Sequence, residues 1–234
     1  MKKCVGLMLF FLCGCASVQV PASFAYREIH TPYFTLAAWV KDSGSLAPLH
    51  IYIEGDGRAY TANGYPSSNP TPKHSLMRQM AFADTAENVA YVARPCQFVK
   101  DPVCTPADWT TARFSARAVQ SMASALQTLA AGRAIEMYAH SGGALLSGLV
   151  IVQYPQLPVQ KWTTYAGLLN HTSWTARMKL APLSGSLDLT QLPDVPQVHY
   201  AGEKDRVILP ELSRQWTAGH TLIIVPRASH RGPF

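Results

Sequence analysis

The sequence predicts an α/β protein: a mostly parallel central sheet with helices on both faces and an antiparallel pair of strands at its N-terminal side. The chain has 234 residues, of which 48% are hydrophobic, enough to bury a single core. From residue 48 onward, short apolar runs alternate with helical patterns, as in parallel sheets covered on both faces. Before that point, the β-rich segments 24–28 and 33–40 favour an antiparallel pair.

The first residues are typical of a secretory signal. Lys2 and Lys3 give a positive start, and residues 5–12 form an apolar segment that is too short to span a bilayer. The whole chain has 20 basic and 14 acidic residues, so removal of the two lysines leaves an excess of four positive charges. Because these charges are scattered rather than clustered, they do not indicate binding to nucleic acid.

The end of the signal, Leu-Cys-Gly-Cys at residues 12–15, resembles the lipobox of bacterial lipoproteins. In such proteins the last cysteine receives diacylglycerol and becomes the new N-terminus. The resemblance implies that residues 1–14 are removed and that a lipid on Cys15 anchors the chain to a membrane, with residues 15–23 as a tether. Ala16 after the cysteine implies sorting to the outer membrane, facing the periplasm. The alternative is an ordinary cleaved signal with an incidental cysteine.

The expected elements of the folded part alternate along the chain. The parallel strands are expected at residues 49–53, 89–92, 135–138, 162–165, 198–200 and 222–225. The helices are expected at residues 74–82, 111–129, 142–152 and 209–216. The second helix carries an apolar stripe made of Ala116, Val119, Met122, Leu126 and Leu129. Residues 24–234 are therefore expected to form one domain.

Two long segments, 58–71 and 95–109, follow strands of the parallel sheet. Because open α/β sheets bind ligands at the carboxyl ends of their strands, both loops are candidate walls of a substrate site; mobile insertions without function are the alternative. The second loop holds Cys96 and Cys104, the only cysteines beyond the signal and the lipidation site. In an oxidising periplasm this pair is expected to form a disulfide, with buried free thiols as the alternative.

Ser141 lies between an expected buried strand and an expected helix, within the run Ala-His-Ser-Gly-Gly at 139–143. This arrangement resembles the G-x-S-x-G nucleophile elbow of the α/β-hydrolase superfamily, with Ala139 in the first position. The resemblance implies the α/β-hydrolase fold and makes Ser141 the nucleophile. The alternative is a serine that merely caps the helix N-terminus.

A serine nucleophile needs a base and a group that orients the base. The family order is serine, acid, histidine, which the resemblance places on Asp205, after one expected strand, and on His230, after the last one. Glu203 is the main rival for the acid. The other histidines considered as bases are weaker candidates: His140, His171 and His199.

The oxyanion hole needs two N–H donors aimed at the developing charge. By resemblance these are the backbone N–H groups of Gly142 and of Asp56, which follows the first parallel strand. Glu54 stands where family members carry histidine. The carboxylates of Glu54 and Asp56 would repel an oxyanion so close to them. We therefore expect both side chains to turn away or to form ion pairs, with Arg58 as one suggested partner.

Four strings are similar to a group of proteobacterial lipoproteins described only as α/β hydrolases: IYIEGDG, PSSNPTP, ARPCQ and WTTARFS. Together the resemblances imply an envelope serine hydrolase acting on a small-molecule or lipid ester or thioester through an acyl-Ser141 intermediate. The alternative is a non-catalytic lipoprotein that uses the scaffold as a binding module; a peptidase is less favoured. The sequence has no G-x-G-x-x-G, P-loop or H-E-x-x-H motif, so no cofactor or metal is expected.

Overall fold

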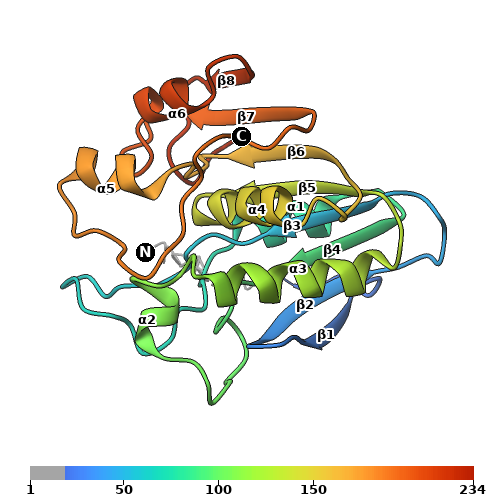
Figure 1. The fold of residues 1–234 in the computed structure, drawn as a ribbon. Helices are drawn as coiled ribbons and strands as arrows, with labels where there is room; N and C mark the ends of the chain where they lie inside the picture. Colours follow the sequence, from blue (N-terminus) through green and yellow to red (C-terminus); the bar gives the residue numbers. More distant parts are fainter. Residues whose placement is uncertain (1–18) are drawn as a thin grey trace, which may run out of the picture.

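The computed structural model describes residues 19–234 (Figure 1), so the predicted signal and the predicted lipidation site at Cys15 lie outside the described residues. The strands are β1 (Ala25–His30), β2 (Thr35–Lys41), β3 (Leu49–Ile53), β4 (Asn88–Val92), β5 (Ile135–His140), β6 (Val159–Tyr165), β7 (Gln197–Gly202) and β8 (Thr221–Val225). The helices are α1 (Leu76–Ala83), α2 (Pro106–Trp109), α3 (Ala116–Ala130), α4 (Gly142–Gln153), α5 (His171–Met178) and α6 (Pro210–Trp216). None of these helices has the length and apolar character needed to cross a membrane.

All eight strands belong to one sheet, in the order β1-β2-β4-β3-β5-β6-β7-β8. β2 pairs antiparallel with both β1 and β4, and every other neighbouring pair is parallel. The predicted fold class is therefore confirmed. The strand order reverses at β3, so the carboxyl ends of β3 and β5 lie side by side at the point where such sheets bind ligands.

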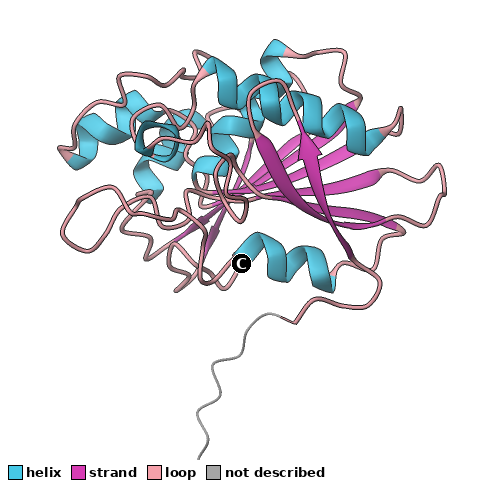
Figure 2. Cartoon of the chain, turned by 90° about the horizontal axis from the view of Figure 1, so that it is seen from below, coloured by secondary structure: helices cyan, strands magenta, loops and turns pink. Residues whose placement is uncertain are grey.

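Helices cover both faces of the sheet (Figure 2). On one face, Ile51 and Ile53 of β3 share the larger core with the apolar residues of α3 and α4. On the other face, Tyr52 of β3 and Tyr91 of β4 share a smaller core with Met77 of α1. Because successive side chains of a strand point to opposite faces, each central strand supplies both cores.

Helix α3 begins at Ala116, later than the predicted start at residue 111. The reason is Ser115, whose hydroxyl accepts the N–H of Ala118 at 3.4 Å and caps the helix. The sequence pattern also does not indicate the short helices α2 and α5. The polar sequence of α5 lacks an apolar stripe; the Asn170 side chain instead caps its start, accepting the Ser173 N–H at 2.7 Å.

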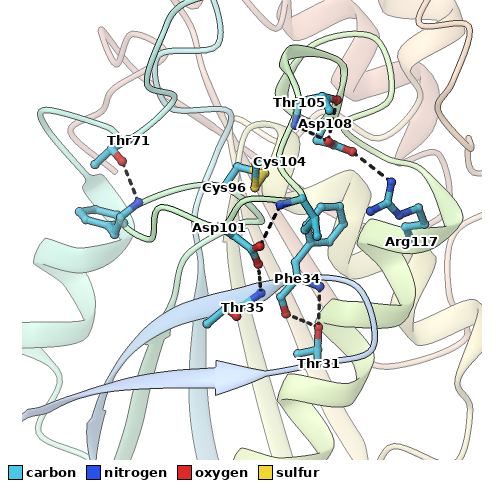
Figure 3. The surroundings of a disulfide bond; sticks show 12 residues. Thr31, Phe34, Thr35, Thr71, Cys96, Asp101, Cys104, Thr105, Asp108 and Arg117 are labelled. Carbon is cyan, nitrogen blue, oxygen red and sulfur yellow. Dashed lines mark hydrogen bonds and ion pairs between the residues drawn. A yellow bond between two sulfur atoms is a disulfide. The ribbon is translucent and has the colours of Figure 1, made fainter.

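The predicted disulfide between Cys96 and Cys104 is present in the loop after β4 (Figure 3). The loop that it closes is also tied to its surroundings, because Asp101 accepts the backbone N–H of Thr35 in β2 at 2.7 Å. At the other end, Phe98 donates its backbone N–H to the Thr71 hydroxyl at 2.7 Å. The disulfide segment therefore links the first long loop to the start of β2.

Candidate active site

Ser141 occupies a strained turn between β5 and α4. Its φ of 53° and ψ of −126° are unfavourable for a residue with a side chain, and such strain clusters at functional sites. The turn needs small neighbours, since a Cβ on Gly143 would lie 2.8 Å from the carbonyl oxygen of Ile53. The Ser141 side chain makes no capping hydrogen bond to α4. The helix-cap alternative therefore does not account for this serine.

Ser141, His230 and Asp205 form a continuous chain of hydrogen bonds. The Ser141 Oγ lies 3.0 Å from His230 Nε2, and His230 Nδ1 lies 2.9 Å from Asp205 Oδ2. Because a carboxylate only accepts hydrogen bonds, Nδ1 carries the proton and Nε2 accepts the serine hydroxyl. The Asp205 side chain is fully buried, and its Oδ1 accepts the N–H groups of Val207 and Ile208 at 2.8 and 2.9 Å.

The turn after β7 brings the loop that carries His230 into place. A Cβ on Gly202 would lie 2.8 Å from the carbonyl oxygen of Ser229, so the glycine permits this close approach. Glu203, the rival acid, is exposed on the surface, where its carboxylate accepts the backbone N–H of Arg227 in the same loop at 2.8 Å. The structure thus brings Asp205, and not Glu203, to His230.

His140, the residue before Ser141, has a role that the sequence does not indicate. Its Nε2 donates to the backbone carbonyl of His230 at 2.8 Å, and the two rings lie 4.9 Å apart between centroids. Burial and the neighbouring His230 lower the pKa of His140 to about 4. His140 is therefore a neutral side chain that holds the backbone of His230.

The other two rival histidines lie apart from the serine. His199 is buried inside β7, where its ring contacts Thr164 Oγ1 at 2.8 Å and Gln197 Oε1 at 2.9 Å. His171 is buried against the ring of Phe114. Neither ring is hydrogen-bonded to Ser141 in the described part of the chain.

The loop after β3, which the sequence predicts to supply an oxyanion donor, runs beside Ser141. A Cβ on Gly55 would lie 3.2 Å from the Cβ of Ser141. Glu54 turns inward, where its carboxylate accepts hydrogen bonds from the hydroxyls of Tyr91, at 2.7 Å, and Ser75. Burial raises the pKa of Glu54 despite these bonds. This carboxylate is therefore held away from the position where an oxyanion would form.

The Asp56 carboxylate does not turn away but packs directly against Gly142. It forms ion pairs with Arg94, from the segment after β4, and with Nε of Arg113 at 3.3 Å. Burial raises the pKa of Asp56, but the two guanidinium groups outweigh burial and hold it below the usual value. Asp56 is thus an ionised group whose charge is compensated.

The suggested pairing of Asp56 with Arg58 is wrong. Arg58 instead donates from Nε to the backbone carbonyl of Thr71 at 3.1 Å and so braces its own loop. The partners of Asp56 are Arg94 and Arg113, which were not predicted from the sequence. Arg94 comes just after the carboxyl end of the parallel strand β4. Asp205 was predicted from the same kind of position, so Arg94 could have been predicted as a site residue too.

A cavity of about 830 Å³ opens over Ser141 and His230. The first long loop lines it through Arg58, Ala59, Tyr60 and Gly64, as predicted for a substrate wall. The second long loop, 95–109, contributes none of the cavity residues in the described chain, so that expectation is wrong; the loop is closed by its disulfide and bound to the start of β2 instead. The opposite wall comes from α5 and the segment after it: Trp174, Leu180, Ala181 and Leu183.

No protein-family model matches the chain, and no curated protein matches it in sequence. Among solved structures, XC6422 from Xanthomonas campestris, an α/β serine hydrolase without a lid, is 15% identical with a TM-score of 0.57 over 90% of this chain and 87% of that one. Est1E from Butyrivibrio proteoclasticus is 13% identical, with a TM-score of 0.62 over 91% and 92% of the two chains. A puromycin-hydrolysing peptidase of Mycobacterium tuberculosis is 15% identical with a TM-score of 0.62, over 88% of this chain and 36% of that chain. These likenesses show that the chain has the α/β-hydrolase fold.

Proposed function

We propose that the protein is a serine hydrolase that transfers an acyl group from an ester or thioester to water. The observation that carries the proposal is the hydrogen-bond chain from Ser141 through His230 to Asp205 at the floor of a large cavity. A neutral serine is a weak nucleophile, and an adjacent base that is itself oriented by an acid is the arrangement that activates it.

In the first half of the reaction, Ser141 Oγ attacks the carbonyl carbon of the substrate while its proton passes to His230 Nε2. The tetrahedral intermediate then collapses, the bond between carbon and the leaving oxygen or sulfur breaks, and His230 returns the proton to the leaving group. The alcohol or thiol departs, and the acyl group remains as an ester on Ser141. Asp205 keeps His230 in the required tautomer and stabilises its charged form.

In the second half, a water molecule gives a proton to His230 Nε2 and its oxygen attacks the acyl carbon. Collapse of the second intermediate breaks the bond to Ser141 Oγ, which takes the proton back from His230. The carboxylic acid leaves and the free enzyme is restored. Each half thus transfers one proton to His230 and one from it.

The proposed oxyanion donors are the backbone N–H groups of Gly142 and Asp56. Gly142 begins α4, so the helix N-terminus adds a partial positive charge beside the oxyanion. Arg94 and Arg113 compensate the Asp56 carboxylate that packs against Gly142. Without these two cations, a free carboxylate at that place would oppose the developing negative charge.

The proposed location of this reaction is the periplasmic side of the bacterial outer membrane, with the chain held by lipid on Cys15. Its support is the lipobox-like segment at residues 12–15 after an apolar run. A bacterial lipoprotein carries several acyl chains, which is what stable attachment requires, since a single chain binds only marginally.

The test of the hydrolase proposal is turnover of p-nitrophenyl acetate by the purified domain. Ser141→Ala and His230→Ala should each remove nearly all turnover, and the double variant should be little worse than either, because the two residues act as a unit. The control is Ser173→Ala, because the Ser173 hydroxyl makes no hydrogen bond to the described residues. Turnover by folded Ser141→Ala at the wild-type rate would overturn the proposal and favour a non-catalytic binding module.

A further inference from the structure

Arg113 is a charged side chain that the proposed chemistry leaves partly unused. Its exposed fraction is only 3%, yet it lines the cavity that contains Ser141. Its Nε lies 3.3 Å from Asp56 Oδ2 but has no hydrogen-bond partner, and its terminal nitrogens make no hydrogen bond to any of the residues 19–234. A buried guanidinium normally satisfies its donors, because leaving them unsatisfied costs free energy.

The neighbours of Arg113 do not account for its charge. Asp56 already has a closer partner in Arg94, which also donates to the Arg113 backbone carbonyl at 2.6 Å. Asp56 and the two arginines together carry one net positive charge at the cavity wall. The rings of Phe114 and Trp174 flank the Arg113 guanidinium at 5.6 and 5.8 Å and hold it in place without consuming its donors.

The other charged side chains that line the cavity also give it a positive charge. Three further cationic side chains line it: Arg58, Lys73 and Arg231. Its two carboxylates are engaged within the protein, since Glu54 is turned inward and Asp56 is ion-paired. The cavity therefore favours an anionic ligand. Among the cationic side chains that line it, Arg113 is the one paired with Asp56, which packs on Gly142 next to Ser141.

We propose that Arg113 binds an anionic oxygen group, a carboxylate or a phosphate, on the substrate whose ester bond Ser141 attacks. This inference rests on the proposed hydrolase function and adds the substrate class: an ester that carries a second, negatively charged end. The planar guanidinium fork matches two oxygens of one anionic group, and the buried position strengthens the charge-assisted bonds.

The test compares two substrates of the same shape, mono-p-nitrophenyl glutarate, which is anionic, and its neutral methyl ester. The wild type should prefer the anionic ester in kcat/KM by about 10- to 100-fold, the range for a hydrogen bond to a charged group. Arg113→Met should lower that ratio at least about tenfold, and Arg113→Lys should keep part of it. Lys73→Met is the matched control, because it removes an equal charge from the exposed part of the same cavity.

Binding without turnover separates this inference from the hydrolase proposal. Glutarate and inorganic phosphate, titrated calorimetrically into Ser141→Ala, should bind, and the added Arg113→Met change should abolish binding; the tighter of the two identifies the anionic group. Hydrolysis of both esters without preference, or equal effects of Arg113→Met and Lys73→Met, would overturn the anionic substrate class and leave the hydrolase standing. Glutarate binding that depends on Arg113, in a protein that turns over neither ester, would support the anion site and overturn the hydrolase proposal.

Discussion

Replacement of Asp205 by asparagine tests the most specific assignment at the site. The Asp205 Oδ1 is fixed by the backbone N–H groups of Val207 and Ile208, so an asparagine oxygen is expected to keep that place. Its amide nitrogen would then face His230 Nδ1, now 2.9 Å from Oδ2, and would donate to it. His230 would be held with its proton on Nε2, where it cannot accept the Ser141 proton.

The expected loss follows from this wrong tautomer. In a serine triad the equivalent change lowers turnover by about 10⁴-fold with the geometry intact, so we expect kcat of Asp205→Asn on p-nitrophenyl acetate to fall by about 10³- to 10⁴-fold. Glu203→Gln keeps an acceptor for the Arg227 N–H and should change kcat by less than about threefold. Circular dichroism and thermal unfolding check that both variants fold. A larger loss in Glu203→Gln than in Asp205→Asn would refute the assignment of the acid.

Three further predictions concern stability and location. Replacing Cys96 and Cys104 together by alanine should lower the free energy of unfolding by about 2 to 3 kcal/mol in urea titrations; an unchanged midpoint would contradict this. Burial lowers the pKa values of His140 and His199 to about 4, so the unfolded state binds more protons below pH 6.5. Unfolding free energy should therefore fall between pH 6.5 and 4, by about 3 kcal/mol per histidine, and a flat profile would refute this. Wild-type protein should fractionate with membranes and incorporate palmitate, whereas Cys15→Ser should not.

The sheet was predictable because its strands are short, strongly apolar runs separated by helical patterns. The predicted segment 49–53 coincides with β3, and the predicted segment 222–225 begins one residue after the start of β8. The ends of helices were less predictable, since α3 starts at a serine cap and not where its apolar pattern fades. Helix α5 depends on a cap at Asn170 and on tertiary contacts, neither of which leaves an apolar period in the sequence.

At the site, chain order and strand ends were sufficient to bring Asp205 and His230 to Ser141. Arg94 also follows the end of a parallel strand, but its position alone does not name Asp56 as its partner, and Arg113 follows no strand; both meet the Asp56 carboxylate only in the folded chain. For the same reason, the sequence could not tell which long loop lines the cavity. A disulfide loop at a strand end can line the site or pack on another strand, and here Asp101 binds it to β2.

The most direct test of the central claim, that Ser141 is an activated nucleophile, is labelling of the purified domain with a fluorophosphonate followed by peptide mapping. We expect a single modified peptide containing Ser141, with labelling abolished in Ser141→Ala and greatly slowed in His230→Ala. Unmodified Ser141 in folded wild-type protein, or equal labelling of wild type and Ser141→Ala, would contradict it.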